Sequence, residues 1–276
     1  MNCFYINLQS ATDRHAAITA NFKTYAPPTW RLNKVDAIDV TYILKHGIKG
    51  TLRDSEKACF LSHRKALELS LGKKGHVFIL EDDTIFGPSS CEQITEALKF
   101  KKDADWDILY TDIGTGDTGL MAQLLKLRQA LVAVKGFQVL NLQKFKYFGT
   151  TAYIINGRSK QKILNLLTKQ SELNIPVDDF LCQLCYDGRI KASVLFPFLT
   201  TSSELGNNSS TQLDQLQRVN QYQAFFRQMT WLHADTSRMD ENIRNFENGL
   251  DQRNALFRRI NAGLIDEYFG NKDVII

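Results

Sequence analysis

Residues 76–86 read HVFILEDDTIF, in which four consecutive apolar residues are followed by three carboxylates. An apolar run with two β-branched members is typical of a strand that is buried on both faces, as in a parallel sheet. Ligands bind at the carboxyl ends of strands in open α/β sheets. Because the adjacent charges of Glu81, Asp82 and Asp83 repel one another, the cluster favours a hard cation such as Mg²⁺ or Mn²⁺. A solvated acidic turn is the alternative interpretation.

The composition is that of an ordinary soluble globular protein, with 43% hydrophobic and 23% charged residues, so a large core is expected. At 276 residues the chain is long enough for one large or two small domains. The net charge of +4 is too weakly basic to indicate nucleic acid, and we expect no such partner. It suits a polyanionic partner such as a nucleotide-sugar or an anionic membrane surface.

The first eight residues, MNCFYINL, contain neither a basic region nor a long apolar region, so they indicate a strand rather than a signal peptide. No apolar run approaches the roughly 20 residues that a membrane-spanning helix needs. We therefore expect a cytoplasmic protein, and this expectation leaves peripheral contact with a membrane open.

Strand and helix patterns alternate along the first part of the chain, as in an α/β fold. Strands are predicted at residues 4–8, 30–35, 77–80, 106–112, 138–142, 149–156 and 193–198. Helices are predicted at residues 12–22, 55–71, 91–101, 120–134 and 159–168, with another beginning after Pro176. Residues 43–50 are ambiguous because Gly47 and Gly50 suggest a loop. Ser55 is the expected N-cap of its helix, and Lys160 is expected to point outward.

Polar residues follow the first predicted strand closely. Asn7, Asp13 and Arg14 lie where a loop could hold the base, ribose and phosphate of a nucleotide. The alternative is a capped turn with a surface ion pair, and spacing alone favours that alternative.

Two further polar residues lie on the helix predicted at residues 55–71. A lone histidine on a helix is more often a core or surface residue than a ligand, and Ser62 and His63 alone indicate nothing more. This helix leads through a short turn directly into the strand of residues 76–86, however. Ser62 and His63 could therefore line the same cleft as the three carboxylates.

A second carboxylate pair follows Pro176, where Asp178 and Asp179 precede an apolar helix start. Acidic residues in the first turn of a helix stabilise it by capping, which is one complete explanation. The functional interpretation is a carboxylate site that faces the first one, with one member acting as a general base.

Five cysteines are scattered along the chain, and a large cytosolic protein does not need disulfides. Cys182 and Cys185 have CxxC spacing, but no second cysteine pair and no spaced histidine pair completes a zinc site. Because they follow Phe180 and Leu181 in a predicted helix, buried core cysteines are the better interpretation.

The composition changes after Ser202, where a polar stretch rich in Ser and Asn begins. Residues 1–205 are therefore predicted to form the catalytic domain, and residues 206–276 a helical C-terminal region. The apolar stripe of that region could pack on the catalytic domain, form a homodimer or contact a membrane. Packing on the domain is the preferred interpretation, because most apolar stripes are core.

In this order, the motifs resemble those of glycosyltransferase family 25, which includes bacterial lipooligosaccharide and lipopolysaccharide galactosyl- and glucosyltransferases. The resemblance covers residues 1–205 and rests on YINL with Asp13 and Arg14, ACFLSH at 58–63, ILEDD at 79–83, WDILY at 106–110, GTTAYII at 149–155 and PVDD at 176–179. The chain departs from the family pattern in two places: Lys57-Ala58 stands where the family usually has an apolar residue and a glycine, and Gln9 replaces a frequent acidic residue.

The resemblance implies a GT-A-like fold, that is, a Rossmann-like and mostly parallel sheet flanked by helices. It further implies an inverting, metal-dependent transfer of a hexose from UDP-galactose or UDP-glucose, with galactose favoured, to an outer-core sugar of lipooligosaccharide or lipopolysaccharide. The ion would be Mn²⁺ or Mg²⁺ on Asp83 and Glu81, and Asp179 is preferred over Asp178 as the base. Contacts to the nucleotide-sugar are expected from Asn7, Arg14, Ser62, His63, Glu81 and Asp82.

Other functions remain open for the same residues. Two carboxylates that flank a sugar could also serve a glycoside hydrolase. A nucleotidyltransferase, or a sugar-binding module without turnover, is a further alternative. The lipid-linked acceptor that the resemblance implies is compatible with a cytoplasmic enzyme that attaches peripherally to the cytosolic face of the inner membrane.

Overall fold

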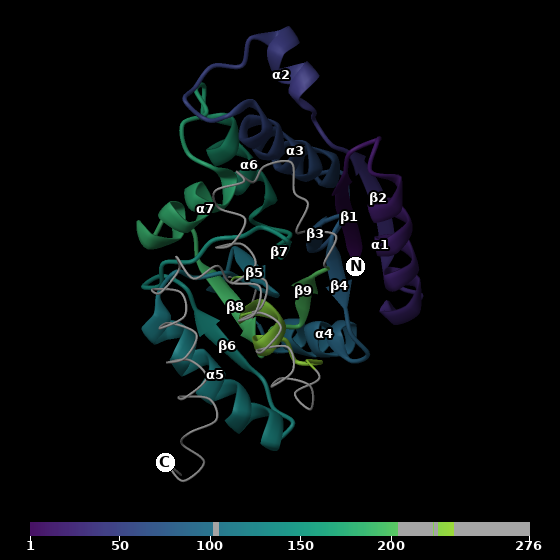
Figure 1. Ribbon diagram of the computed structural model, residues 1–276, viewed down its shortest axis with the longest axis vertical. Coiled ribbons are helices and arrows are strands. Elements are labelled where there is room, and N and C mark those ends of the chain that lie inside the picture. Colours follow the sequence, from purple (N-terminus) through teal and green to yellow (C-terminus); the bar gives the residue numbers. More distant parts are fainter. Residues whose placement is uncertain (102–104, 204–222, 224–225, 235–276) are drawn as a thin grey trace, which may run out of the picture.

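A computed structural model describes residues 1–101, 105–203, 223 and 226–234 of the chain. Its centre is a seven-stranded sheet with the order β2-β1-β3-β7-β5-β8-β6 (Figure 1). The strands are β1 (Asn2–Asn7), β2 (Arg31–Asp36), β3 (Val77–Glu81), β5 (Ile108–Tyr110), β6 (Gln138–Asn141), β7 (Ala152–Ile155) and β8 (Ala192–Phe196). Strands β7 and β6 run antiparallel to their neighbours, and the other five strands run in one direction. The sheet is therefore mixed and mostly parallel.

Helices cover both faces of this sheet (Figure 1). They are α1 (Thr12–Tyr25), α2 (Val40–His46), α3 (Asp54–Ser70), α4 (Ser90–Phe100), α5 (Thr118–Ala133), α6 (Lys160–Thr168) and α7 (Val177–Tyr186). Buried residues of α1 and α4 share one hydrophobic cluster, and those of α3, α5, α6 and α7 share the other. This arrangement confirms the predicted GT-A-like α/β fold.

Strand β3 is buried on both faces, as the apolar run at residues 77–80 predicts. Val77 and Ile79 belong to the core on the α3 side, and Phe78 and Leu80 belong to the core on the α1 side. The strand is parallel to β1 on one side but antiparallel to β7 on the other. An apolar run indicates that a strand is buried on both faces, but it does not indicate whether each neighbouring strand is parallel or antiparallel.

Two helix starts differ from the sequence expectation. The N-cap of α3 is Arg53 rather than Ser55, and the backbone N–H of Arg53 donates to Glu56 Oε2 at 3.0 Å. The ambiguous residues 43–50 contain most of α2, whose N-cap Asp39 accepts a hydrogen bond from the Tyr42 backbone N–H at 2.8 Å. Gly47 ends α2 with a φ of 56°, a left-handed conformation that glycine adopts without strain.

Lys160 does not point outward. Its side chain is buried, and its ammonium donates to the backbone carbonyl of Ser70 at 3.2 Å and to that of Lys73. These carbonyls lie at and just after the end of α3, where carbonyl groups have no partner within the helix. A lysine at this position therefore ties α6 to the end of α3.

A short hairpin and the described C-terminal residues lie beside the sheet. Strands β4 (Thr84–Phe86) and β9 (Thr200–Ser202) pair in antiparallel fashion directly after the carboxylates of residues 81–83. Residues 226–230 are helical, and Phe226, Met229 and Thr230 are buried against the core. Most of the predicted helical region of residues 206–276 lies outside the described residues, so that prediction stays open.

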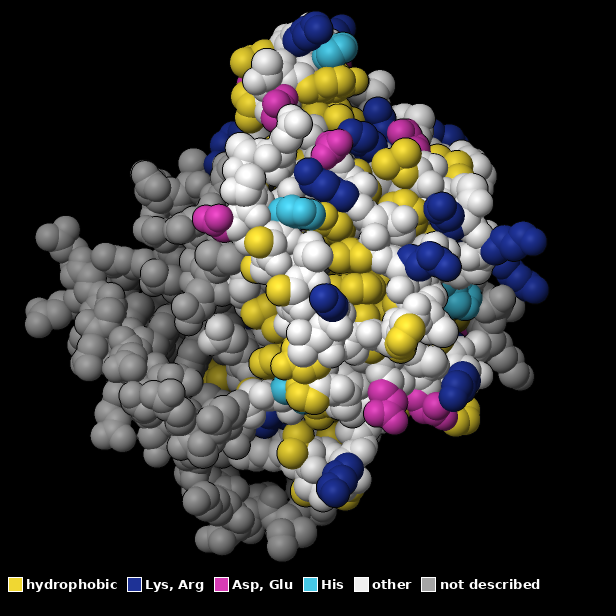
Figure 2. All heavy atoms as spheres, turned by 90° about the vertical axis from the view of Figure 1, so that its right-hand side faces the viewer, with side chains coloured by type: hydrophobic (Ala, Val, Ile, Leu, Met, Phe, Trp, Pro, Cys, Tyr) yellow, Lys and Arg dark blue, Asp and Glu magenta, His cyan; other side chains and the backbone are white. Residues whose placement is uncertain are grey.

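Basic side chains are spread over the face that carries α1 and β2, and they do not merge into one stripe in this view (Figure 2). Among the described residues, no helix is both long enough and apolar enough to cross a membrane.

Candidate active site

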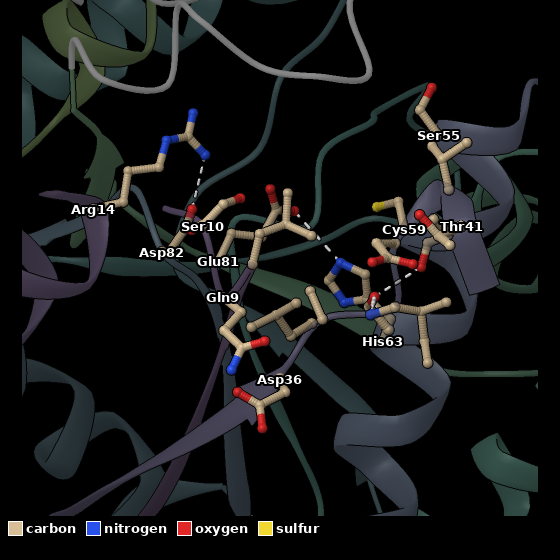
Figure 3. Close-up of a pocket in the computed structure, with 18 residues that line it drawn as sticks. Gln9, Ser10, Arg14, Asp36, Thr41, Ser55, Cys59, His63, Glu81 and Asp82 are labelled. Carbon is tan, nitrogen blue, oxygen red and sulfur yellow. Dashed lines mark hydrogen bonds and ion pairs between the residues drawn. The ribbon is translucent and has the colours of Figure 1, made fainter. Parts of the chain in front are cut away.

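Three neighbouring parallel strands end at one edge of the sheet with polar residues. The register pairs Asn7 of β1 with Asp36 of β2, and Ile6 of β1 with Glu81 of β3. The chain leaves β1 for β2 on one side and enters β3 on the other side, so the crevice between β1 and β3 is a topological switch point. A cavity of about 820 Å³ opens at this edge (Figure 3). Among the predicted site residues, it is lined by Arg14, Ser62, His63, Glu81 and Asp82.

Asp82 is held by two of the predicted site residues. Asn7 Nδ2 donates to Asp82 Oδ2 at 2.8 Å, and Arg14 Nη1 donates to Asp82 Oδ1 at 2.8 Å. Asp82 is buried, so both of its oxygens are compensated by fixed donors. The structure therefore brings Asn7, Arg14 and Asp82 into one cluster, in which Asp82 orients Arg14 at the cavity wall (Figure 3).

Glu81 lies between the Arg14–Asp82 pair and His63 (Figure 3). Its Oε1 accepts a hydrogen bond from Thr150 Oγ1 at 2.9 Å and lies 3.5 Å from His63 Nε2. The other ring nitrogen of His63, Nδ1, lies 3.0 Å from the Tyr153 hydroxyl. Burial alone would raise the pKa of Glu81. The interactions with His63 and Thr150 lower this pKa by more, so the net shift is downward. Glu81 is therefore an ionised carboxylate at the wall of the cavity.

Ser62 uses its hydroxyl within the protein. It donates to the Ala58 carbonyl at 2.7 Å and accepts from the Ile38 backbone N–H at 2.8 Å. Ile38 belongs to the loop after β2, which lines the cavity together with Asp36 and Asp39. Ser62 therefore joins α3 to the loop that forms one wall of the site.

The second carboxylate pair lies at the start of α7. Asp178 Oδ2 accepts a hydrogen bond from the Gly149 backbone N–H at 3.0 Å, and the next residue, Thr150, donates to Glu81. Burial raises the pKa of the cavity-lining Cys59, and the nearby charges of Glu81 and Asp178 raise it further. The side chain of Asp179 is exposed overall. Partial desolvation of its carboxyl and the charge of Asp178 raise its pKa. Asp178 is thus linked to Glu81 through the adjacent residues Gly149 and Thr150.

The charge of Arg227 acts on Asp83, and Arg227 belongs to an ion pair that the sequence did not place in the site. Burial, followed by the charge of Glu81, raises the pKa of Asp83 to about 7. Asp112 follows β5, is almost fully buried, and forms an ion pair with Arg227. Both Asp83 Oδ1 and Asp112 Oδ1 are buried atoms without a hydrogen-bond partner. The predicted strand at residues 106–112 ends in a carboxylate, and that was the available signal for Asp112.

A hard divalent cation at this edge would depend on few protein ligands. The described residues contain no group of three or more His, Cys, Asp or Glu arranged to hold a metal. Mg²⁺ and Mn²⁺ are commonly bound by one or two carboxylates, with substrate phosphates and water completing the shell. Glu81 and the unpartnered Oδ1 of Asp83 supply oxygens of this kind.

Comparison with known sequences gives the family. The profile of glycosyltransferase family 25, described as LPS biosynthesis protein, matches residues 1–181. The chain belongs to glycosyltransferase family 25. It is therefore a glycosyltransferase, and its family is described as one of lipopolysaccharide biosynthesis proteins. No curated protein sequence matches the chain.

Three solved structures that resemble this family 25 chain share 9–12% of its sequence. The galactosyltransferase LgtC, in complex with donor and acceptor sugar analogues, is 12% identical, with a TM-score of 0.41 over 79% of this chain and 82% of its own. The inositol-1-phosphate CTP transferase from T. maritima is 12% identical, with a TM-score of 0.37 over 79% of this chain and 94% of its own. Mouse xyloside xylosyltransferase 1 is 9% identical, with a TM-score of 0.32 over 69% and 63%.

The family match contains every predicted site residue and also Asp112 and Thr150. Arg227 lies beyond it, in the part of the chain for which the family resemblance makes no statement. Its partner in the ion pair is 115 positions away, so no local pattern could connect the two.

Proposed function

We propose that this family 25 glycosyltransferase transfers a hexose from a UDP-sugar to an outer-core sugar of lipooligosaccharide or lipopolysaccharide, with a divalent metal and inversion of configuration. We propose galactose before glucose as the hexose. The observation that carries the proposal is the position of Glu81 and Asp83 at the carboxyl end of β3, beside the switch point between β1 and β3. Carboxylates at that place in an α/β sheet suit a metal-bound diphosphate.

The donor occupies the cavity at the carboxyl edge in this proposal. Its volume of about 820 Å³ lies in the usual range for small-molecule sites. Asp36, at the end of β2, has a largely exposed carboxylate that can accept hydrogen bonds from ribose hydroxyls. Arg14, oriented by Asp82, supplies a guanidinium on the same wall for an anionic group.

Glu81 and Asp83 would hold the metal, as Mn²⁺ or Mg²⁺. When bound, the ion neutralises the charge that develops on the departing UDP. Thr150 and His63 fix the orientation of Glu81, because both lie against its Oε1. Asn7 and Arg14 fix the neighbouring Asp82, so the chain between β3 and β4 has little freedom.

An inverting transfer needs one carboxylate to remove the proton of the acceptor hydroxyl during in-line attack. We assign this role to Asp178 rather than Asp179. Asp178 bonds the Gly149 backbone N–H and acts electrostatically on Cys59 in the cavity wall, whereas Asp179 is exposed. A lipid-linked acceptor places this reaction at the cytosolic face of the inner membrane, and that placement belongs to the proposal.

The test is release of UDP from UDP-galactose, UDP-glucose and the two UDP-N-acetylhexosamines, measured with Mn²⁺ and again with EDTA. The proposal predicts turnover of one UDP-hexose that requires the metal, accelerated by a lipooligosaccharide acceptor. Metal-independent release of free sugar from a glycoside would favour a hydrolase instead. Binding of a UDP-sugar without hydrolysis or transfer would indicate a non-catalytic binding module.

A further inference from the structure

Arg227 reaches the acidic edge of the sheet from the C-terminal part of the chain. Its guanidinium forms an ion pair with Asp112, in which Nη2 contacts Oδ2. The side chain of Asp112 is 1% exposed and that of Arg227 is 14% exposed, so the pair is shielded from water. A charged pair in such surroundings is strong only when its geometry is held by the fold.

The fold holds the helical residues 226–230 in place. Phe226 and Met229 are buried in the core on the α3 side of the sheet. The backbone N–H of Phe198 donates to the Thr230 carbonyl at 3.1 Å, and that of Leu232 donates to the Phe198 carbonyl at 2.8 Å. The guanidinium is therefore presented to the acidic edge by a packed segment.

Arg227 pairs with Asp112, and two further carboxylates act on its guanidinium through their charge. Burial lowers the pKa of Arg227, but the charges of Asp112, Asp83 and Glu81 raise it above its ordinary value. The effect of all three carboxylates on Arg227 ties this residue electrostatically to the acidic edge of the sheet.

Unpartnered atoms of both kinds are found on this ion pair and on Asp83. Asp83 Oδ1 and Asp112 Oδ1 are buried acceptors without a donor, and Arg227 Nε is a buried donor without an acceptor. Unpartnered carboxylate oxygens suit a cation, whereas an unpartnered guanidinium N–H suits an anion. A metal-bound diphosphate presents both charges at once.

We propose that Arg227 binds the diphosphate of the donor, with Asp112 holding the guanidinium so that its Nε–H is directed to a phosphate oxygen. This inference rests on the UDP-sugar donor proposed above and adds a residue from outside the family match. The C-terminal segment thereby completes the donor site. A guanidinium suits this task because its planar fork can bond a carboxylate and a phosphate together.

A merely structural role for Arg227 makes a different prediction. If the guanidinium only neutralises Asp112, its removal disorders this edge of the sheet and weakens the binding of every ligand there. If it binds diphosphate, its removal affects the two ligands in opposite directions. A cation binds more tightly when a neighbouring positive charge is lost, and an anion binds less tightly.

The experiment compares wild type with Arg227→Gln by titration calorimetry, first with Mn²⁺ alone and then with UDP at saturating Mn²⁺. We expect Mn²⁺ to bind about threefold more tightly, and UDP to bind at least about tenfold more weakly. Arg227→Lys keeps the charge without the fork and should fall between the two. The matched control is Arg31→Gln, at the exposed start of β2 on the opposite edge of the sheet.

Asp112→Asn/Arg227→Gln removes both charges of the pair and guards against misfolding caused by an unpaired buried Asp112. It should show the same loss of UDP affinity. The inference is overturned if Mn²⁺ and UDP both bind more weakly, or if the affinity for UDP is unchanged in either variant. Wild-type protein that binds neither Mn²⁺ nor UDP would overturn the proposed donor itself, whereas wild-type binding with an unaffected Arg227→Gln overturns only the role of Arg227.

Discussion

Arg14 Nη1 lies 2.8 Å from Asp82 Oδ1, and this ion pair joins α1 to the carboxyl end of β3 across 68 positions of sequence. The side chain of Asp82 is only 9% exposed, so the carboxylate depends on its donors. Asn7 compensates the second oxygen of the same carboxylate. The wall of the cavity is thus built from a buried charge with specific partners.

Arg14→Gln should destabilise the protein and weaken donor binding together. Among the described hydrogen bonds, the change leaves the Asp82 carboxylate with Asn7 as its one remaining partner. The loss of one partner by a buried carboxylate costs about 1–3 kcal/mol of unfolding free energy. Urea denaturation measures the first effect and UDP titration the second. Arg31→Gln serves as the control with no effect on either, and an Arg14→Gln protein of unchanged stability would show that Asp82 does not need this partner.

Asp83 makes the stability of the metal-free protein depend on pH. Its pKa is about 7 in the folded state and about 3.9 in an unfolded chain, so the folded state binds more protons between these values. Stability therefore falls as pH rises from about 4 through 7. Asp83→Asn should remove this fall, which thermal denaturation in EDTA measures at a series of pH values. Identical pH profiles for the two proteins would mean that Asp83 does not carry the shift.

The same protonation should oppose metal binding. Mn²⁺ needs the ionised form of Asp83, so the affinity of the wild-type protein should rise as pH increases toward 7 and level off above it. Calorimetric titration with Mn²⁺ between pH 5 and 8 measures this dependence. A flat profile over that range would exclude Asp83 as a ligand that must lose a proton.

Asp178 and Asp179 should differ sharply as variants. Asp178→Asn should abolish transfer to acceptor while UDP binding persists, because an amide cannot take the proton of a hydroxyl. Asp179→Asn should keep most of the activity, since its exposed carboxylate makes no contact with the cavity wall among the hydrogen bonds described. The reverse result, with loss of transfer only in Asp179→Asn, would restore the preference drawn from sequence.

Gly149 links the two carboxylate sites through backbone geometry. Its φ of 94° is one that other residues rarely adopt, although a Cβ would meet no atom closer than 3.8 Å. Gly149→Ala should therefore cost about 1–3 kcal/mol of unfolding free energy through backbone strain. It should also lower activity, because the flanking bonds to Asp178 and Glu81 shift together. Unchanged urea denaturation would show that alanine accommodates this φ.

Much of the fold could be predicted because its signals are local. The apolar run of β3 and the helical spacing of α3 each report their own burial. Helix α2 was not resolved from sequence because it is short, buries Ile43 as its only buried residue, and ends at a glycine. The antiparallel direction of β7 depends on how the chain returns to the sheet, which residues 149–156 do not encode.

Part of the candidate site could likewise be predicted from local sequence, and part of it depends on the tertiary structure. Glu81, Asp82 and Asp83 are adjacent in sequence, so their clustering needs no tertiary information. The bond from Asn7 to Asp82 depends on the register of β1 with β3, and sequence spacing alone favoured a surface turn there. The pair of Asp112 with Arg227 joins residues 115 positions apart, and only the three-dimensional structure could connect them.

The most direct test of the proposed function is UDP release from UDP-galactose and UDP-glucose by wild type and Asp83→Asn, each with saturating Mn²⁺ and with EDTA. Folding of the variant is checked by its urea denaturation. We predict release by wild type that disappears in EDTA, and no release by a folded Asp83→Asn protein. Release that persists in EDTA, or an Asp83→Asn protein as active as wild type, would contradict a metal-dependent transferase centred on the carboxyl end of β3.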